Sequence, residues 1–321
     1  MPGPRAAAPP HPLAWPGDRG GHLWAKDREV VLDDGTRVRY AVRGPGDAPV
    51  VVGAAGFLCP DNFWRDLAPP LSIDHRVVIL NYRGTGASTE AGGGATPPAA
   101  SAYTIPHLAE DVAAVLDAEG ARRATVLGHS MGVQVALALW RARPELVGAL
   151  VLVAGTYASP FRTMYGRATA AHLFPLLSMF GAAAPREVTR RLLRAIELPL
   201  AMPVGRVLRA VGATTPLAGM TTYRAHMTRM DPRTAIWTAR AMHGFDPTPW
   251  LHRIDVPTSV LVGNADGWCP VSVGEALVAA VPDAQLEVVD GASHTLPLEF
   301  PEVVLPHVRR LAATTRTTGT A

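Results

Sequence analysis

The clearest sign of chemistry in this sequence is a serine with a glycine two residues before it and another two residues after it. Ser130 stands in the pentapeptide Gly128-His129-Ser130-Met131-Gly132, after a short apolar run and before an apolar helical pattern. A serine at such a strand-to-helix turn is typical of a nucleophile elbow, which exposes the hydroxyl at the edge of a sheet. Gly128 and Gly132 suit this turn because it leaves almost no room for side chains. We expect Ser130 to be a nucleophile, with the Met131 N–H at the start of the helix pointing at a forming oxyanion.

A base and an acid follow two other predicted strands. His294 comes after the strand expected at 286–289, and Asp266 comes after the strand expected at 259–262. The order Ser…Asp…His, with one residue at each of three strand ends, is an arrangement that acyl transfer needs. In it, His294 accepts the serine proton and returns it to the leaving group, while Asp266 holds the imidazole tautomer. Asp290 is a second candidate for the acid, although it lies only four residues before His294.

The elements that must position these residues alternate between strand and helix, with one interruption. Between residues 156 and 245 the patterns are helical only and are broken by prolines. Alternation interrupted once predicts an α/β fold: a mostly parallel, doubly wound sheet with an inserted helical cap. The strands are expected at 29–32, 36–42, 50–52, 77–80, 124–127, 149–153, 259–262 and 286–289. Helices of the core are expected at 61–67, about 104–120, 133–140, 273–281 and 302–311.

The composition divides the chain into four parts. Residues 1–22 are expected to be a flexible N-terminal arm, and residues 314–321 a disordered polar tail. The α/β core is expected in 23–155 and 246–313, with the helical cap in 156–245. The cap stretch carries seven of the nine methionines, which suit either an irregular apolar ligand or the ordinary core of a small helical lid. Its few carboxylates disfavour a cationic substrate, and the cap is expected to form a mainly apolar pocket for an acyl or leaving group.

Four motifs together resemble the α/β-hydrolase superfamily, in its capped single-domain form. They are Gly128-His129-Ser130-Met131-Gly132, Arg83-Gly84-Thr85-Gly86-Ala87-Ser88, Gly263-Asn264-Ala265-Asp266 and Gly291-Ala292-Ser293-His294, within a resemblance that covers about residues 29–313. The resemblance implies oxyanion donors at the backbone N–H groups of Met131 and Phe57. Many relatives begin the oxyanion loop with His-Gly where this sequence has Ala55-Gly56, so Gly56 stays open as an alternative to Phe57.

Bulk composition disfavours several functional classes. The 321 residues carry a net charge of +3, but the positive side chains are scattered arginines with Lys26 as the only lysine, so no nucleic-acid partner is expected. Two cysteines cannot build a metal site by themselves, and no metal or cofactor is expected. No stretch approaches the ~20 apolar residues of a membrane span. We expect a cytoplasmic protein with a small-molecule substrate, and its oligomeric state stays open.

Four further residues near these motifs have structural interpretations. His129 is expected to pack or hydrogen-bond beneath the elbow, and Arg83 to anchor its own loop. Cys59 and Cys269 follow site loops, which makes them candidates for the pocket wall. Both are expected to be unreactive thiols, because no neighbouring base is evident.

The sequence as a whole predicts a serine hydrolase that cleaves an ester, thioester or lactone with an apolar acyl part, through an acyl-enzyme. One alternative keeps the same triad for hydrolysis of a carbon–carbon bond, or for a cyclase or acyltransferase step of secondary metabolism. An alternative of another class is a ligand receptor on the same fold without catalysis. Fold does not determine substrate, and nothing in the sequence names the acyl group.

Overall fold

Eight strands form a single sheet in the part of the chain that the computed structural model describes, which comprises residues 23–94, 98–164, 169–194, 200–207, 209, 211–212 and 214–316. The order across the sheet is β1-β2-β4-β3-β5-β6-β7-β8. Strand β2 pairs antiparallel with β1 and β4, and every other pairing is parallel. The strands are β1 (Arg28–Val31), β2 (Arg37–Arg43), β3 (Val50–Ala54), β4 (Arg76–Leu80), β5 (Ala124–His129), β6 (Val147–Val153), β7 (Thr258–Gly263) and β8 (Gln285–Val289).

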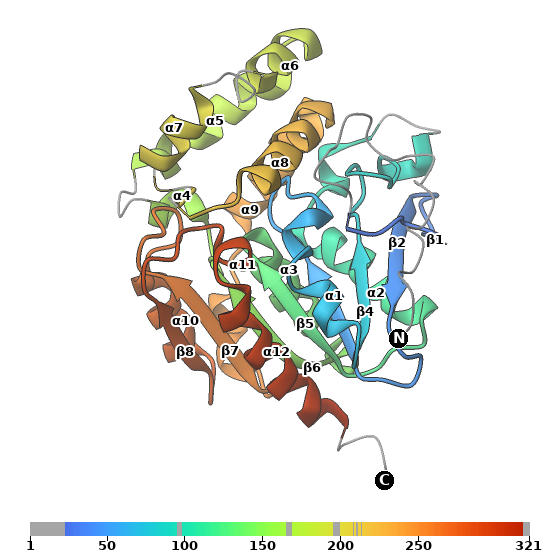
Figure 1. The fold of residues 1–321 in the computed structure, drawn as a ribbon. Helices are drawn as coiled ribbons and strands as arrows, with labels where there is room; N and C mark the ends of the chain where they lie inside the picture. Colours follow the sequence, from blue (N-terminus) through green and yellow to red (C-terminus); the bar gives the residue numbers. More distant parts are fainter. Residues whose placement is uncertain are drawn as a thin grey trace.

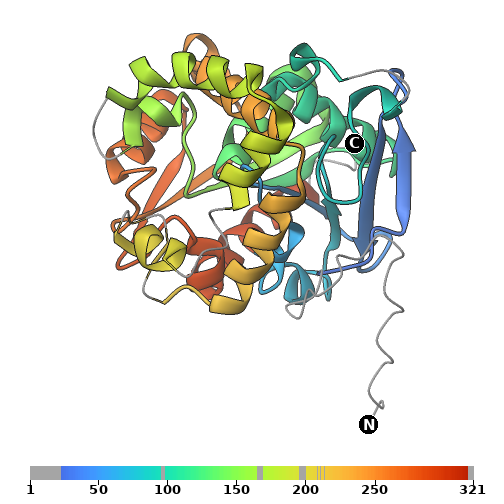
Figure 2. The same cartoon turned by 90° about the horizontal axis from the view of Figure 1, so that it is seen from above.

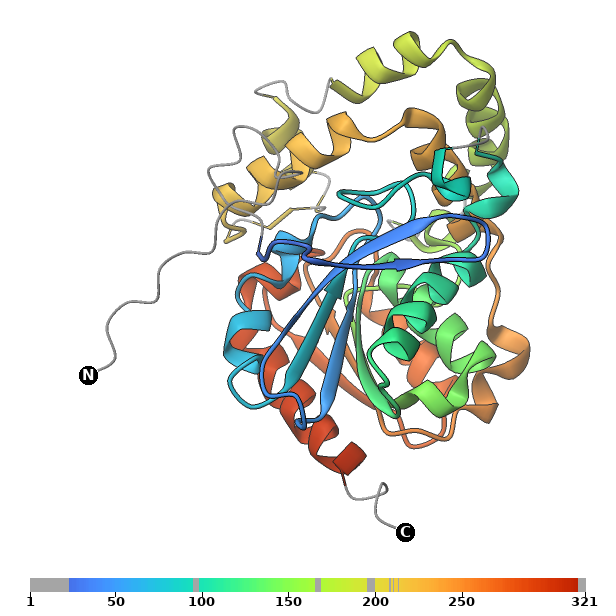
Figure 3. The same cartoon turned by 90° about the vertical axis from the view of Figure 1, so that its right-hand side faces the viewer.

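Helices cover both faces of this sheet, as expected for a doubly wound fold (Figure 3). One face carries α1 (Ala68–Leu71) and α12 (Pro301–Arg316), while the other carries α2 (Ile105–Ala118) and α3 (Met131–Ala142). Helix α10 (Val271–Ala280) packs on β7 and β8, and the short α11 (Leu296–Glu299) leads into α12. Because helices bury both of its faces, the central strands β5 and β6 are buried along their whole length and mostly apolar.

Between β6 and β7 the chain leaves the sheet and forms helices α4 to α9, which we call the inserted helices. They are α4 (Pro160–Thr163), α5 (Thr169–Ala183), α6 (Arg186–Arg194), α7 (Ala201–Val207), α8 (Leu217–Arg229) and α9 (Pro232–Gly244). Figure 1 shows them gathered at one end of the sheet, with α5 and α6 reaching farthest from it, and Figure 2 shows the same helices from above, where α7 lies apart from α5. The two strands that flank them in the sequence are hydrogen-bonded neighbours, with Val153 opposite Leu261. The mostly parallel sheet and its helical insertion confirm the predicted fold class.

The boundaries differ from the sequence prediction by more than two residues at two of the predicted helices. The stretch expected to be one helix at 61–67 is a 3-10 helix, η1 (Asp61–Trp64), followed by α1. Helix α12 continues to Arg316, so residues 314–316 are helical where the tail was expected to begin. The expected arm at 1–22 and the rest of the tail lie outside the described residues. Among the helices of the described ranges, none is long and apolar enough to cross a membrane.

Candidate active site

The turn that carries Ser130 joins β5 directly to α3 and has the backbone of a nucleophile elbow. Ser130 has φ 56° and ψ −118°, a conformation that non-glycine residues rarely adopt. A Cβ on Gly132 would lie 1.9 Å from the Ala54 carbonyl oxygen, and one on Gly128 would lie 2.6 Å from the Gly132 carbonyl oxygen. The turn therefore requires glycine at both positions, as the sequence predicts.

Loops at the carboxyl ends of β5, β7 and β8 bring the three predicted triad side chains together. His294 Nε2 lies 2.9 Å from Ser130 Oγ, and His294 Nδ1 lies 2.9 Å from Asp266 Oδ2. The Asp266 side chain is fully buried, and its other oxygen accepts backbone N–H groups from Trp268 at 2.7 Å and Cys269 at 2.9 Å. These two bonds hold the carboxylate in place, so that its free oxygen faces the imidazole.

The rival carboxylate, Asp290, has a different partner. Its Oδ1 accepts a hydrogen bond from Asn264 Nδ2 at 2.7 Å, in an exposed part of the loop after β8. The Asn264 side chain also accepts the Gly291 N–H at 2.9 Å. Asp290 therefore helps to shape the loop, and the carboxylate beside His294 is that of Asp266.

His129 lies beneath the elbow and supports the loop of His294. Its Nε2 lies 2.9 Å from the His294 carbonyl oxygen, to which it donates. Its ring stacks on Phe63 at 5.1 Å between centroids and is buried. Burial, followed by the proximity of His294, lowers the pKa of His129 to about 3, so this imidazole is neutral at physiological pH. The expected packing and hydrogen-bonding position of His129 is confirmed.

The two predicted oxyanion donors lie on either side of Ser130. Met131 is the first residue of α3, where a backbone N–H has no acceptor within the helix. The loop after β3 passes close to the nucleophile, since a Cβ on Gly56 would lie 3.0 Å from Ser130 Cβ. Phe57 follows in this loop, and both Phe57 and Met131 line the cavity above Ser130. Donation by Met131 and by Phe57 or Gly56 stays a prediction.

A cavity of about 490 Å³ opens above Ser130 and His294, between the sheet edge and the inserted helices. Most of its wall is apolar, and it includes both cysteines, Cys59 and Cys269. Burial raises the pKa of each thiol far above its ordinary value, so both are protonated and unreactive at neutral pH. Four of the seven methionines counted in the cap stretch line the cavity: Met202, Met220, Met227 and Met242, joined by Met131 from the core. The predicted apolar pocket is therefore present.

Two aromatic residues of the site were not anticipated from the sequence. The Trp268 ring stacks on the His294 imidazole, with centroids 5.5 Å apart and planes at 29°. Tyr223 of α8 lines the cavity and lies against Phe63 at 5.7 Å between ring centroids. Trp268 could have been suspected, because it stands two residues after Asp266 in the turn that caps the carboxylate. Tyr223 lies in a helix without a local motif, and nothing in the sequence points to it.

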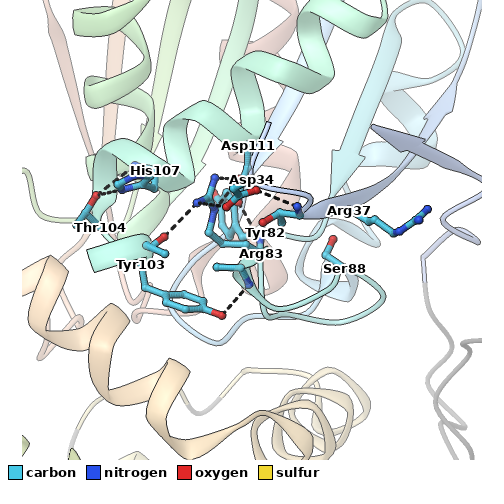
Figure 4. Close-up of polar contacts among 12 residues, drawn as sticks. Asp34, Arg37, Tyr82, Arg83, Ser88, Tyr103, Thr104, His107 and Asp111 are labelled. Carbon is cyan, nitrogen blue, oxygen red and sulfur yellow. Dashed lines mark hydrogen bonds and ion pairs between the residues drawn. The ribbon is translucent and has the colours of Figure 1, made fainter. Parts of the chain in front are cut away.

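Arg83, in the loop after β4, is a buried anchor (Figure 4). Its Nε and Nη2 donate to Asp111 Oδ1 at 2.8 and 2.6 Å, and its backbone N–H donates to Asp111 Oδ2 at 2.8 Å. Nη1 donates to the Ala102 carbonyl oxygen at 3.2 Å. Arg83 is not among the residues that line the cavity, in agreement with the predicted structural role.

Among the residues that the structure describes, one group of side chains has the geometry for a metal ion, and it overlaps the triad. Ligand atoms of Asp266, Cys269 and His294 lie within 4.8 Å of one another. Both side chains of the Asp266–His294 pair are already hydrogen-bonded, and the Cys269 thiol is protonated at neutral pH. A metal would have to compete with the triad for these atoms, so the donor set fits an acid–base pair better than a metal centre.

Comparison with known proteins agrees with this geometry. A family model described as alpha/beta hydrolase fold matches residues 49–301. The protein named "Putative carbamate hydrolase RutD" of Pseudomonas savastanoi pv. phaseolicola is 28% identical over 268 residues, covering 81% of this chain and 93% of that protein. Among solved structures, the esterase RhEst1 from Rhodococcus sp. ECU1013 is 26% identical with a TM-score of 0.68, covering 89% of this chain and 98% of its own. A hydrolase from Pseudomonas aeruginosa PA01 has a TM-score of 0.70 at 24% identity, covering 88% and 97%. The chain therefore belongs to the alpha/beta hydrolase fold family and is an enzyme of the hydrolase class.

Proposed function

We propose that this enzyme is a serine hydrolase that cleaves a carboxylic ester, thioester or lactone with an apolar acyl part. The observation that carries the proposal is the chain of two 2.9 Å contacts from Ser130 through His294 to Asp266, at the floor of an apolar cavity. A nucleophile, a base and an acid in hydrogen-bond reach of one another are the requirement for forming and breaking an acyl-enzyme.

The reaction proceeds in two halves. Ser130 Oγ attacks the carbonyl carbon as its proton passes to His294 Nε2, and the new oxyanion is held by the N–H of Met131 and a second N–H from Phe57 or Gly56. The bond from the carbonyl carbon to the leaving oxygen, or to sulfur in a thioester, then breaks, and His294 returns the proton to that leaving atom. Water repeats the sequence on the acyl-enzyme and releases the acid. Throughout, Asp266 keeps the Nδ1 proton of His294 in place and stabilises the imidazolium.

The size and wall of the cavity support an apolar acyl group. A volume of about 490 Å³ is within the roughly 300–1,000 Å³ range of small-molecule sites. An apolar wall rich in methionine adapts to flexible carbon chains. The name of RhEst1 is that of an esterase, while that of the RutD relative refers to a carbamate. An unsubstituted carbamate is small and polar, so this cavity favours the ester class.

The test is hydrolysis of chromogenic esters with acyl chains from C2 to C12, by wild type and Ser130→Ala in parallel. We expect wild-type activity with an optimum at one chain length, and a loss of about 10⁴-fold or more in Ser130→Ala. Labelling by a fluorophosphonate should occur in wild type only. Ser130→Ala that keeps more than a few per cent of wild-type activity would contradict the triad assignment.

Silence across the series has two separable meanings. If a fluorophosphonate still labels Ser130, the nucleophile is active and its substrate is specialised, as in carbon–carbon bond hydrolysis, cyclisation or acyl transfer. If neither assay responds, the receptor alternative gains support.

The predicted domain boundaries and the predicted cytoplasmic location are not tested by this experiment and stay predictions. Both cysteines are free thiols in the structure.

A further inference from the structure

One short stretch of the insertion is hydrogen-bonded to both loops that carry the acid and the base of the triad. We call the loop after β7, with Asp266, the acid loop, and the loop after β8, with His294, the base loop. The stretch lies between α7 and α8 and is called the α7–α8 link. Its described residues are Arg209, Val211, Gly212, Thr214 and Thr215. The two loops therefore share a support that lies outside the sheet.

Arg209 makes the contacts between the α7–α8 link and the acid loop. Its guanidinium donates to the carbonyl oxygens of Ala265 at 3.2 Å and Asn264 at 3.0 Å. Its own carbonyl oxygen accepts the Gly267 N–H at 3.1 Å. Ala265 and Gly267 are the two neighbours of Asp266 in the sequence, so the link holds the backbone on both sides of the acid.

Glu299 of α11 connects the same link to the base loop, with one carboxylate oxygen for each. Its Oε1 accepts the Thr215 hydroxyl at 2.9 Å and the Thr214 hydroxyl at 3.1 Å. Its Oε2 accepts both the backbone N–H and the hydroxyl of Ser293, each at 2.8 Å. Ser293 is buried and directly precedes His294. Hydrogen bonds to a carboxylate are roughly twice as strong as neutral ones, so four donors make Glu299 a firm anchor.

The Thr215 hydroxyl has a second contact with the base loop. Its Oγ1 lies 2.6 Å from Oγ1 of Thr295, the residue after His294, and it accepts the Gly212 N–H at 2.9 Å. Both threonine side chains are buried. Because Thr215 gives its hydroxyl proton to Glu299, Thr295 is the donor in the contact between the two threonines. The residues on both sides of His294 are thus tied to Thr215, one directly and one through Glu299.

The α7–α8 link packs so closely on Glu299 that Gly212 has no room for a side chain. A Cβ there would lie 1.9 Å from Glu299 Oε1 and 2.9 Å from Ser293 Oγ. The preceding residue, Val211, is buried and lines the active-site cavity, as does Thr295. A substrate in the cavity therefore lies against the same segment that supports the two triad loops.

We propose that Thr215 is a positioning residue of the reaction, which acts through Glu299 to hold His294 within reach of Ser130. Because His294 takes the serine proton in the proposed function, this role of Thr215 rests on that function. A misplacement of about 1 Å can cost on the order of 100-fold in rate. Thr215 is not part of the cavity wall, so its effect belongs to the chemical step and not to substrate binding. A segment that replaced the inserted helices would have to supply an equivalent support.

The test compares Thr215→Val, which keeps the shape of the side chain without its hydroxyl, with Thr215→Ser, which keeps the hydroxyl. On the best ester we expect Thr215→Val to lower kcat at least about tenfold, with KM within about twofold of wild type. Thr215→Ser should restore kcat to within about threefold. The control is Thr189→Val, which should behave as wild type. Thr189 is also buried in the inserted helices, but its hydroxyl donates to the Arg186 carbonyl oxygen of its own helix at 3.0 Å.

A second variant reaches Glu299 from another side. Gly212→Ala pushes a methyl group onto the carboxylate and should lower kcat in the same way, also if Thr215→Val does not fold. Gly244→Ala in α9 is its control, because a Cβ there meets nothing within 4 Å. Hydrogen exchange followed by mass spectrometry needs no turnover. Residues 291–299 should exchange at least about threefold faster in Thr215→Val and in Gly212→Ala, while residues 124–132 stay unchanged.

Three results would overturn the positioning role of Thr215. One is a folded Thr215→Val with wild-type kcat, or with a raised KM at constant kcat. Another is a Thr215→Ser variant as slow as Thr215→Val. The last is unchanged hydrogen exchange at residues 291–299. If wild type hydrolyses no ester, or Ser130→Ala hydrolyses esters equally well, the proposed function fails instead, and the exchange experiment still decides whether the link holds the base loop.

Discussion

Two carboxylates near His294 have different surroundings, and this difference predicts different costs when each is neutralised. Asp266→Asn keeps the shape of the side chain but offers His294 an amide, which disturbs the imidazole tautomer. We expect activity to fall by about 10³ to 10⁴-fold. Asp290→Asn should stay within about threefold of wild type, because Asp290 contacts Asn264 instead. Steady-state kinetics on the best ester measures both, and the reverse order would move the acid to Asp290.

His129 predicts a pH dependence of stability. Its pKa is about 3 in the folded protein, below the ordinary value of 6.5. Between these two values the unfolded chain binds a proton that the folded protein does not, so stability falls as pH drops below about 6.5. From pH 8 to pH 5 this group alone removes about 2 kcal/mol from the free energy of unfolding.

His129→Gln isolates that contribution, because glutamine can still donate to the His294 carbonyl but does not titrate. The variant should be less stable than wild type at pH 8, and the difference should shrink by about 2 kcal/mol at pH 5. Urea denaturation at both pH values measures it. A difference that stays constant with pH would show that His129 is not buried as a neutral group.

Residue types and spacing predicted the three residues of the candidate triad, but not the aromatic side chains around them. The positions of Ser130, Asp266 and His294 follow from three local motifs at three strand ends, and parallel strands bring such ends together. The stacking of Trp268 on His294 and the placement of Tyr223 in the cavity depend on contacts between distant segments. No local pattern encodes those contacts.

Among the elements, the elbow has the strictest steric requirement. Gly132→Ala would place a methyl group 1.9 Å from the Ala54 carbonyl oxygen. Both the new methyl group and this oxygen are attached directly to the backbone, so neither can move away easily. We expect a loss of at least about 3 kcal/mol in the free energy of unfolding, or insoluble protein. Gly46→Ala is the matched control, since a Cβ there meets nothing within 4 Å. Chemical denaturation compares the two, and a stable, active Gly132→Ala would contradict the elbow geometry.

The sequence predicted helices and strands well where the apolar pattern is long. It predicted them less well where tertiary packing determines the local conformation. The strands were predicted to within two residues at either end because their buried runs are bounded by turn residues. The helix expected at 61–67 is instead divided between η1 and α1. Proline is accepted in the first turn of a helix, so Pro69 and Pro70 favour a new helix beginning at Ala68. All four residues of η1 are buried, which shows that packing shapes this segment.

For the whole molecule, the loop that Arg83 anchors in the core also contacts one of the inserted helices. The Arg83–Asp111 pair is buried, and the next part of the same loop reaches α9, where Thr234 donates to Glu90 at 3.0 Å. Arg83→Met leaves Asp111 buried without its cation, and we expect a loss of about 3–5 kcal/mol in the free energy of unfolding. Arg122→Met, which removes an exposed partner of Asp117, should cost less than about 1 kcal/mol.

Urea denaturation at neutral pH distinguishes the two variants. Adding Asp111→Leu to Arg83→Met should recover part of the loss, because the unpaired charge is then gone. A single variant Arg83→Met that is as stable as Arg122→Met would show that the buried pair contributes little to holding the loop.

At this scale the sequence predicted the sheet with its helical insertion, but not which helical faces stay uncovered. Helix α5 is apolar around most of its circumference, so its sequence does not show which of its sides faces the core. Which of its side chains are covered depends on how α5 packs on α4 and α9, which is a matter of tertiary arrangement (Figure 2).

The pairing of β6 with β7 has a consequence for how such a protein can change over time. The inserted helices begin after one strand and end before its neighbour in the sheet, with Val153 beside Leu261. The two ends of the insertion lie close together for another reason: Gln134 Nε2 of α3 donates to the carbonyl oxygens of both Ala158, at 2.7 Å, and Met242, at 3.1 Å. Neither strand therefore has to move when the stretch between these ends is exchanged. A single recombination event could therefore replace the inserted helices that cover the cavity, while the elbow after β5 and the loops after β7 and β8 remain unchanged. A new substrate range would then arise by the exchange of one segment rather than by many single substitutions.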